Sequence, residues 1–348
     1  DDSSVGPFRH ELPRRKESKK SMIILVTGGA GYVGSHASRM LAAAGHEVWV
    51  YDNLSLGHRE AVAEGRLIEG DLHDGELIEQ VLGEKSVDAV MHFAALTQVG
   101  ESVSDPASYY NNNVLGAFSL LEAMRRAGVK RFIFSSTTAT YGEPETIPIT
   151  EKEPQQPINP YGFTKLVIEK VLADYASAYG LAYAAFRYFN AAGAHPDGDL
   201  GEDHDPETHL IPIVLQVALG QRDQITIFGS DYSTPDGTCV RDYVHVDDLA
   251  QAHLAALDRL QEGEGLRLNL GTGCGNSVRE IVEASQRVTG CEIPVVEGER
   301  RPGDPPILVA DASLARQVLD WEPRYTDIEQ IIQTAWDWHR SHPHGYQD

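Results

Sequence analysis

The fold of this chain is decided by the stretch Ile23-Ile-Leu-Val-Thr-Gly28-Gly-Ala-Gly31-Tyr-Val-Gly34. A short apolar run is followed directly by three glycines in a GxxGxxG spacing and by the start of a helical pattern. Gly28 permits a tight turn, Gly31 lets a pyrophosphate group approach the backbone, and Gly34 lets the helix pack closely on the strand. A helix that begins here offers free N–H groups and a partial positive charge to phosphates. A glycine-rich turn without a ligand is the alternative, but the position after a buried strand favours a dinucleotide site.

Apolar strands alternate with helical segments through the first half of the chain, a pattern typical of a doubly wound parallel sheet. Strands are expected at 23–27, 47–51, 66–69, 89–93, 131–135 and 182–188. Helices are expected after the glycine turn to residue 41, then at 76–82 and 108–126, and from Pro160 to about residue 179. The sequence therefore predicts an α/β fold of Rossmann type.

The segment AAGAHPDGDLGEDHDPETH, residues 191–209, interrupts this alternation. It is too long to be an ordinary connection inside a compact domain, and such loops often carry binding groups. We therefore expect a dinucleotide-binding domain at 22–189 and a smaller mixed α/β substrate lobe at 190–348, some segments of which are free to return to the first domain. Helices of the lobe are expected at 212–219, 246–260, 278–289 and 328–340. Residues 1–21 are interpreted as a disordered leader or an added extension.

The charge balance restricts the partners of the protein. Its 29 basic against 52 acidic side chains give a formal net charge of −23, and such a surface repels nucleic acids and anionic membranes. No apolar run approaches the ~18 residues of a membrane span, and residues 1–21 contain no apolar core of a signal peptide. We therefore expect a cytoplasmic protein without nucleic-acid or membrane partners. The acid excess also suggests adaptation to a salty cytoplasm, a hypothesis refuted if stability and activity are indifferent to salt.

The cysteines point to the same compartment. Cys239, Cys274 and Cys291 form no CxxC pair and have no histidines at ligand spacing. An odd, scattered set of this kind is typical of reduced thiols in the cytoplasm. The sequence therefore predicts structural thiols and no metal site.

An acidic residue follows the second expected strand, where a Rossmann fold places the group that binds the adenosine ribose. Asp52 stands at this position, and a carboxylate there accepts from the ribose hydroxyls and repels a 2′-phosphate. This favours NAD over NADP, against the alternative of an exposed turn residue before Asn53. Asp71 follows the third strand and suits contact with adenine, with helix N-capping as an equally plausible role.

Tyr161 and Lys165 lie four residues apart at the start of the expected long helix, and therefore share one helix face. A phenol has a pKa near ~10. A neighbouring ammonium and the positive nicotinamide ring are expected to lower this pKa, so that Tyr161 acts as a base. One hydroxyl at the end of the preceding strand is expected to bond the substrate, whereas strand-end capping accounts for the others: Ser135, Ser136, Thr137 and Thr138. The combination predicts an enzyme that moves a hydride on a small substrate.

Motifs from both halves of the chain recur in a familiar order. They are TGGAGYVGSH, HFAA, FIFSST, YGEP, PYGFTK, RYFN, GED, HLIP, IFG, RDYVHVDDLA, NLGTG, RPGDP and HPHGY. Together they resemble the UDP-glucose 4-epimerase branch of the extended short-chain dehydrogenase/reductase family, and the match runs from about Met22 to Tyr346. The resemblance implies NAD as a tightly held cofactor, UDP-glucose and UDP-galactose as substrates, and a homodimer formed through the helices near 108–126 and 161–179.

The resemblance also implies a mechanism. Tyrosinate Tyr161, beside Lys165, would take the proton of the sugar 4-hydroxyl while a hydride passes from C4 to NAD⁺. The 4-ketose would then turn about its diphosphate link and receive the hydride on its other face. Thr137 stands where the family usually places a serine that bridges the tyrosine and the substrate.

Further site residues are carried over by position. The cofactor-binding set is Gly28, Gly31, Tyr32, Val33, Asp52, Asn53, Asp71, Leu72, Phe93, Ala94, Asn112, Tyr161, Lys165 and Tyr188. The substrate-binding set is Thr137, Tyr161, Asn190, Leu210, Phe228, Arg241, Arg301 and Asp304, with Phe189 beside it. Guanidinium groups suit the oxygens of a diphosphate, and a surface ion pair is the alternative for either arginine alone.

Two positions depart from the family pattern. Thr97 stands where some relatives have a lysine near the cofactor phosphates, so NAD retention is expected to depend on other groups. Leu308 stands where a tyrosine restricts the hexose pocket and smaller residues admit N-acetylated sugars. Leucine is intermediate in size, so UDP-glucose and UDP-N-acetylglucosamine both stay open as substrates.

Three rival functions follow from the same motifs. A sugar-nucleotide 4,6-dehydratase or decarboxylase is one, but the dehydratases need an Asp–Glu pair where Thr138 and Ala139 stand here. A non-catalytic NAD-sensing or scaffold protein is the second, and it would have no need of Tyr161, Lys165 and Thr137 together. An epimerase of UDP-pentoses or UDP-uronates is the third, and the pocket residues do not exclude a pentose.

Overall fold

The structure is a computed structural model and describes residues 21–301 and 304–347. Of the expected leader, residues 1–20 lie outside the described residues. None of the helices in the described ranges is long and apolar enough to cross a membrane. The three cysteines are all free thiols, with Cys239 buried and Cys274 exposed.

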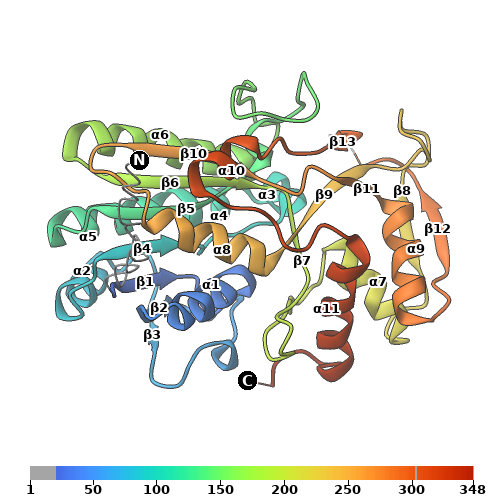
Figure 1. Cartoon of the computed structure of the whole chain (residues 1–348), viewed down its shortest axis with the longest axis horizontal. Helices are drawn as coiled ribbons and strands as arrows, with labels where there is room; N and C mark the ends of the chain where they lie inside the picture. The colour runs from blue at the N-terminus through green and yellow to red at the C-terminus, as the bar shows by residue number, and fades with distance from the viewer. Residues whose placement is uncertain (1–20, 302–303, 348) are drawn as a thin grey trace, which may run out of the picture.

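A seven-stranded parallel sheet forms the centre of the larger part of the molecule (Figure 1). Its order is β10-β6-β5-β4-β1-β2-β3, and the chain reverses direction across the sheet between β1 and β4. The strands are β1 Ile23–Thr27, β2 Glu47–Asp52, β3 Leu67–Glu69, β4 Ala89–His92, β5 Arg131–Thr137, β6 Ala182–Tyr188 and β10 Gly265–Leu270. Ligands of such sheets bind beside the carboxyl ends of the strands at the reversal point. The Rossmann-type prediction is confirmed.

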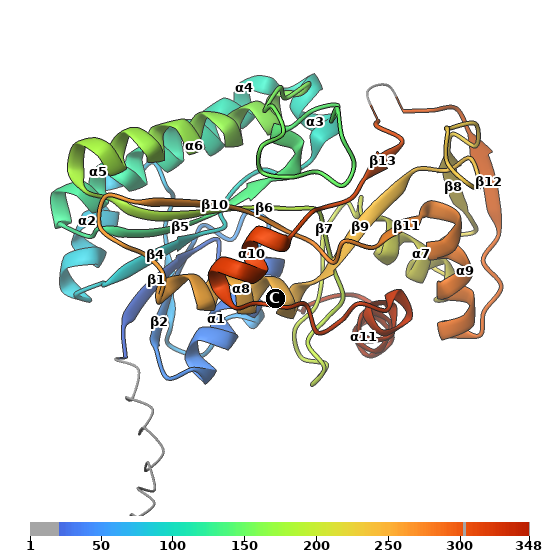
Figure 2. The ribbon, with the colours of Figure 1, turned by 45° about the horizontal axis from the view of Figure 1, so that its top comes forward.

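Helices cover both faces of this sheet (Figure 2). One face carries α2 Gly75–Glu84, α5 Ala117–Ala127 and α6 Pro160–Tyr179, packed over a core that includes Leu120, Phe132 and Leu172. The other face carries α1 Tyr32–Ala43, α8 Val246–Leu257 and α10 Ser313–Leu319. The segments β10, α8 and α10 come from beyond residue 190 and lie against the first sheet, so the second half of the chain contributes to both parts of the molecule.

The smaller lobe is built around β9 Val240–His245 (Figure 1). This strand pairs with β7 Asn190–Ala192, β11 Gly275–Ser277 and β13 Ile307–Leu308, and a separate pair joins β8 Ile225–Phe228 to β12 Val295–Gly298. Three helices pack on these strands through a shared apolar core: α7 Leu210–Ala218, α9 Val278–Thr289 and α11 Ile328–Ser341. The lobe is mixed α/β, as predicted.

The expected helix at 108–126 is interrupted. It is divided into α4 Pro106–Tyr109, the π-helical turn η2 Tyr110–Gly116 and α5, after a short α3 Val99–Ser104 that was not expected. Asn113 lies inside the π turn and is buried, and its amide binds backbone outside the helix. An inserted residue of this type widens a helix locally and is frequent at functional sites. Smaller differences concern ends: β5 runs on to Thr137, and α8 ends at Leu257.

Candidate active site

One cavity of about 1660 Å³ opens at the carboxyl ends of β1, β4, β5 and β6 and extends to the smaller lobe. Every residue predicted for the cofactor or the substrate contributes to its wall. The structure therefore brings together residues that lie as far apart in the chain as Gly28 and Leu308. Thr97 and Leu308, the two positions that depart from the family pattern, also line the cavity. The roles assigned to them stay predictions, and their geometry is described below.

The glycine turn between β1 and α1 fits a dinucleotide. Gly28 has a left-handed backbone, φ +73°, and a Cβ there would lie 2.3 Å from the backbone nitrogen of Ala94. At Gly31 a Cβ would meet only Gly28 O, at 3.5 Å, so the protein itself leaves the space in front of this residue open. Among the described residues no side chain caps the start of α1, and Tyr32 and Val33 line the cavity with their first-turn N–H groups available.

Replacing Gly28 by alanine is expected to release the cofactor and destabilise the chain, because the new Cβ would overlap the backbone that follows β4. Gly45→Ala is a matched control, since Gly45 also has a positive φ of +91° but has nothing within 4 Å of its Cβ position. The control should cost only about 1 kcal/mol of strain. Bound nucleotide, measured after denaturation of each purified variant, checks the prediction. Equal nucleotide content in both variants would contradict it.

Two acids line the end of the cavity that is predicted to bind adenosine. Asp52 is 9% exposed, and its carboxylate accepts hydrogen bonds from the backbone N–H groups of Ala30 and Leu54 at 3.0 and 2.9 Å. Burial raises the pKa of Asp52 above its usual value, and these hydrogen bonds only partly oppose the rise. The exposed-turn alternative for Asp52 is wrong, because the side chain is buried on the cavity wall. It has lone pairs left for ribose hydroxyls.

Asp71 is held differently. Its carboxylate accepts from the His73 backbone N–H and from the Asn53 amide, both at 2.9 Å, and the His73 hydrogen bond lowers its pKa. The helix N-cap of α2 is Asp74, which accepts from Leu77 N–H at 3.0 Å. The N-capping alternative for Asp71 is therefore wrong, and its place in the cavity wall beside Asn53 is compatible with the predicted contact to adenine.

The start of α6 positions the predicted base. Asn159 caps the helix by accepting from Gly162 N–H at 2.8 Å, and Pro160 follows with a backbone angle suited to the first turn. Tyr161 is thereby fixed on the cavity wall, edge-on to the ring of Tyr109 with centroids 6.5 Å apart. Thr164 Oγ1 donates to Tyr161 O at 2.7 Å and tightens the same turn.

Lys165 lies one turn further along α6 and is 3% exposed. Its Nζ donates to Ser135 O at 2.8 Å and lies 5.9 Å from the ring centroid of Tyr161. Burial lowers the pKa of Lys165 to about 7. The ammonium is therefore close enough to act on the phenol, and its charge is itself sensitive to the polarity of the cavity.

The lowered pKa of Tyr161 was predicted for a phenol beside both Lys165 and a positive nicotinamide ring, and it stays a prediction. Burial raises the pKa of Tyr161 to about 12, and a hydrogen bond with Thr137 opposes this rise. Desolvation of the phenolate is the largest influence on this pKa, and the Lys165 nitrogen donates to a backbone carbonyl. A positive nicotinamide ring beside Tyr161 would add to the charge of Lys165 in favouring the phenolate.

The four hydroxyl groups at the end of β5 have different hydrogen-bond partners. Ser136 Oγ donates to Glu169 at 2.5 Å in the interior, and Ser135 Oγ is bonded to the hydroxyl of Tyr188. Thr138 begins a short 3-10 turn, and the Thr137 hydroxyl accepts from Ala139 N–H at 3.2 Å. Of the four, Thr137 is the one whose hydrogen bond acts on the pKa of Tyr161, which agrees with its predicted place between the base and the substrate.

The far end of the cavity carries the predicted arginines. Arg241 forms an ion pair with Asp304 at the cavity wall and donates to Val240 O at 2.8 Å. Arg301 lies over the ring of Phe228, 4.2 Å from its centroid. Arg241 is thus in an ion pair, but the pair lines the cavity instead of the outer surface, and its partner is another predicted substrate residue. Both guanidinium groups face a space that suits a diphosphate.

Sequence reasoning missed two sets of residues around the cavity. Asn113 accepts from Leu96 N–H at 2.8 Å and donates to Leu96 O at 2.9 Å, so it fixes the loop after β4 beside the cofactor turn. The three consecutive asparagines at 111–113 inside a helical pattern were the available signal. The other set lies in the loop 202–209, where acids and histidines alternate along the cavity wall.

Comparison with known proteins gives matches over nearly the whole chain. Residues 24–271 match the model of the NAD dependent epimerase/dehydratase family. The chain is 52% identical over 326 residues to the UDP-glucose 4-epimerase of Halalkalibacterium halodurans, covering 93% of this chain and 98% of that protein. It is 53% identical over 331 residues to the UDP-glucose 4-epimerase of Streptococcus mutans, covering 94% and 99%.

Solved structures agree with these sequence matches. The UDP-glucose 4-epimerase of Brucella ovis in complex with NAD superposes with a TM-score of 0.88 at 52% identity, covering 91% of this chain and 98% of that one. The UDP-glucose 4-epimerase of Bifidobacterium longum in complex with NAD⁺ and UDP superposes with a TM-score of 0.89 at 38% identity, covering 93% and 100%.

Proposed function

The chain belongs to the NAD-dependent epimerase/dehydratase family, as its motifs predicted, and we propose from this premise that it interconverts UDP-glucose and UDP-galactose reversibly. The cofactor is NAD, whose site is the glycine turn with Asp52. The reaction is an isomerisation, so the cofactor leaves it in the redox state in which it entered. The sugar nucleotide would occupy the part of the cavity between Tyr161 and the arginines of the smaller lobe.

One observation carries this proposal. Tyr161, Lys165 and Thr137 meet at the carboxyl end of β5, within the same cavity as the glycine turn on one side and Arg241 on the other. A phenol placed between a dinucleotide site and diphosphate-binding guanidinium groups is suited to act on the sugar of a nucleotide sugar. A protein that only senses NAD has no use for this arrangement.

The side chains divide the chemistry among themselves. Tyr161 takes the proton of the sugar 4-hydroxyl and returns it to the same oxygen, while the Thr137 hydroxyl holds that oxygen in place. The Lys165 ammonium stabilises the phenolate. The bound cofactor supplies the oxidation and re-reduction at C4. Arg241 and Arg301 hold the diphosphate, which leaves the hexose free to present either face to the cofactor.

The 4,6-dehydratase alternative lacks its machinery. Elimination needs a base for the C5 proton, and the two positions that provide an Asp–Glu pair in dehydratases hold Thr138 and Ala139. Thr138 begins the 3-10 turn after β5, and neither side chain has a carboxylate. A 4-ketose formed in this cavity would therefore be returned to an alcohol.

Purified protein incubated with UDP-galactose and no added cofactor is expected to form UDP-glucose, because NAD is retained through both half-reactions. Chromatography of the nucleotide sugars measures the product, and UDP-N-acetylglucosamine in a parallel incubation tests whether Leu308 admits an N-acetyl group. Absence of UDP-glucose even after NAD is supplied would refute the proposed function.

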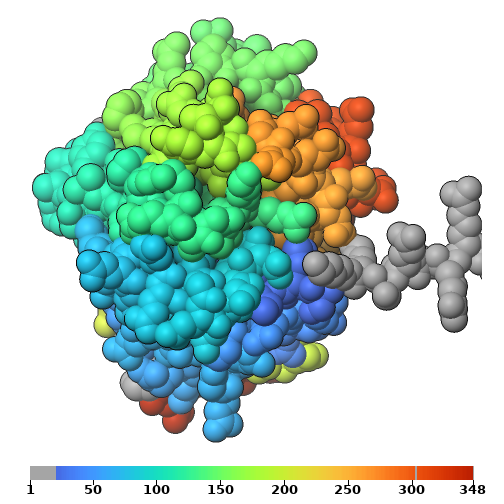
Figure 3. All heavy atoms as spheres, turned by 90° about the vertical axis from the view of Figure 1, so that its left-hand side faces the viewer, coloured from blue at the N-terminus to red at the C-terminus, as the bar shows by residue number. Residues whose placement is uncertain are grey.

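We further propose that two chains associate in the cytoplasm as a homodimer through the segment from α4 to α5 and through α6. Large apolar side chains on these helices are exposed by 39–56%, and they are Tyr110, Leu115, Phe118, Phe163 and Tyr179. Parts of both segments reach the surface in the view of Figure 3. Exposed large apolar side chains gathered on neighbouring helices are typical of a protein interface. Sedimentation of the full chain should give the mass of two copies.

A further inference from the structure

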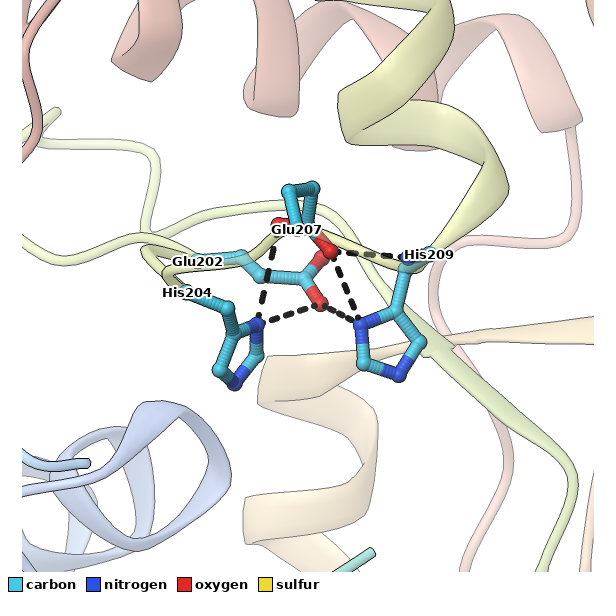
Figure 4. A group of neighbouring side chains, drawn as sticks. All are labelled: Glu202, His204, Glu207 and His209. Atoms are coloured by element: carbon cyan, nitrogen blue, oxygen red, sulfur yellow. Dashed lines mark hydrogen bonds and ion pairs between the residues drawn. The ribbon is translucent and has the colours of Figure 1, made fainter. Parts of the chain in front are cut away.

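A second group of ionisable side chains lies in the loop between β7 and α7 (Figure 4). Glu202, His204, Glu207 and His209 each turn one ligand-type atom toward the others, and these four atoms lie within 4.8 Å of one another. Glu202 and Glu207 are only 4% and 8% exposed. Two buried carboxylates this close repel each other, so the cluster requires compensating positive charge.

The imidazole nitrogens face both carboxylates. His204 Nδ1 lies 3.4 Å from Glu202 Oε1 and 3.6 Å from Glu207 Oε2. His209 Nδ1 lies 2.8 Å from Glu202 Oε1 and 3.2 Å from Glu207 Oε1. Four ligands that are each ~2.0–2.1 Å from a tetrahedral Zn²⁺ lie ~3.3–3.4 Å from one another. The four side chains thus have the spacing of a small cation site.

Two buried polar atoms of this cluster have no hydrogen bond among the described residues. Glu202 Oε1 and His204 Nδ1 are buried, and neither has a hydrogen-bond partner of acceptable geometry within residues 21–301 and 304–347. These two atoms lie 3.4 Å apart and both face the centre of the cluster (Figure 4). Glu207 Oε1 already accepts the backbone N–H groups of Thr208 and His209, both at 2.7 Å, which holds that carboxylate in position. A bound cation would satisfy both of these atoms.

We propose that Glu202, His204, Glu207 and His209 bind one divalent transition-metal ion, for which Zn²⁺ is the best match. Two imidazole nitrogens and two carboxylate oxygens are a donor set that zinc accepts in four-coordinate sites. Two neutral imidazoles, two carboxylates and one divalent cation also make the cluster electrically neutral. The proposal departs from the prediction of no metal site, which was based on the spacing of the cysteines alone.

A network held by protons alone is the competing arrangement. Burial lowers the pKa of His204, but the neighbouring carboxylates of Glu202 and Glu207 outweigh this effect and raise it to about 9. Two histidinium ions would therefore also balance the two carboxylates. The two arrangements can be told apart by measurement, because only the metal site gains stability when a metal ion is added.

The surroundings suit a structural role for the ion. A cavity of about 310 Å³ adjoins the cluster and offers an entry path, with His339 and His342 of the α11 end in its wall. The ring of His204 lies edge-on to Tyr32 of the cofactor turn, with centroids 6.4 Å apart. His209 directly precedes Leu210, the predicted uridine contact. The ion would hold this loop between the cofactor turn and α7.

The test uses the full-length protein without a histidine tag, stripped by a chelator and then titrated with ZnCl₂. We expect one ion per chain, a rise in the Tm of the stripped protein, and a visible spectrum of tetrahedral type when Co²⁺ replaces Zn²⁺. Loss of an outer partner of a ligand already weakens metal binding ~10–100-fold. Glu202→Gln and His204→Gln should therefore weaken it by at least ~100-fold. The metal-free enzyme should show a raised KM for the UDP-sugar with kcat little changed.

Glu283→Gln is the matched control, since Glu283 is exposed on α9 and far along the chain from the loop. It should bind the ion as the wild type does. Failure of the wild type to bind Zn²⁺ or Co²⁺, or binding that survives Glu202→Gln and His204→Gln, would overturn the proposal. The wild-type titration decides the matter even if the variants do not fold. It requires no turnover, so its outcome is independent of the proposed function.

Discussion

Tyr161→Phe is expected to reduce kcat for the conversion of UDP-galactose by a factor of between about 10² and 10⁴, the range that a positioned acid–base group contributes. The Tyr161 phenol is the proposed base between the cofactor turn and the predicted diphosphate site. Burial holds its pKa near 12 in the protein alone, so turnover depends on the positive charge collected around it. Removal of the oxygen removes both the base and the acid of the cycle.

The same variant should keep its NAD. The ring of Tyr161 stays in its edge-on contact with Tyr109, and Asp52 and the glycine turn are untouched. Nucleotide released on denaturation, measured beside steady-state kinetics, separates loss of chemistry from loss of cofactor. A rate within a few-fold of the wild type would mean that another group is the base, and loss of NAD would mean that the residue is needed for binding.

Glu169→Gln is expected to lower the free energy of unfolding by about 3–5 kcal/mol, the usual cost of breaking a buried ion pair from one side. Glu169 and Arg187 are 2% and 3% exposed. Arg187 Nε donates to Glu169 at 2.9 Å, and its Nη1 donates to the Tyr141 hydroxyl at 2.9 Å. Ser136 donates to the same carboxylate. The substitution leaves a guanidinium ion uncompensated in the interior.

The position of this pair links stability to the active site. Glu169 lies on α6, two turns after Tyr161, and Arg187 lies on β6.

Glu69→Gln is the matched control, because it breaks an exposed ion pair with Arg59 and should cost less than about 1 kcal/mol. Urea unfolding followed by circular dichroism measures both. Similar decreases in the free energy of unfolding of the two variants would show that the buried pair stabilises the fold no more than the exposed pair does.

Much of the fold followed from local patterns. The glycine turn, the alternation of apolar strands and helices, and the start of α6 at Pro160 were predicted and are confirmed, because each depends on residues adjacent in the chain. The π turn at Tyr110–Gly116 was missed, since it forms where Asn113 binds the backbone of Leu96 across the fold. Short strands such as β7 and β13 were also missed, because two or three residues carry no periodicity.

The sequence by itself determined the class of fold, the cofactor turn and the pairing of Tyr161 with Lys165, because spacing along one helix or one turn fixes which side chains share a face. Only the tertiary structure decided which groups are buried and what they meet. The raised pKa of Tyr161, the pairing of Arg241 with Asp304 and the convergence of Glu202 with His204 depend on desolvation and on distances across the folded chain. Neither quantity is encoded in any single stretch of residues.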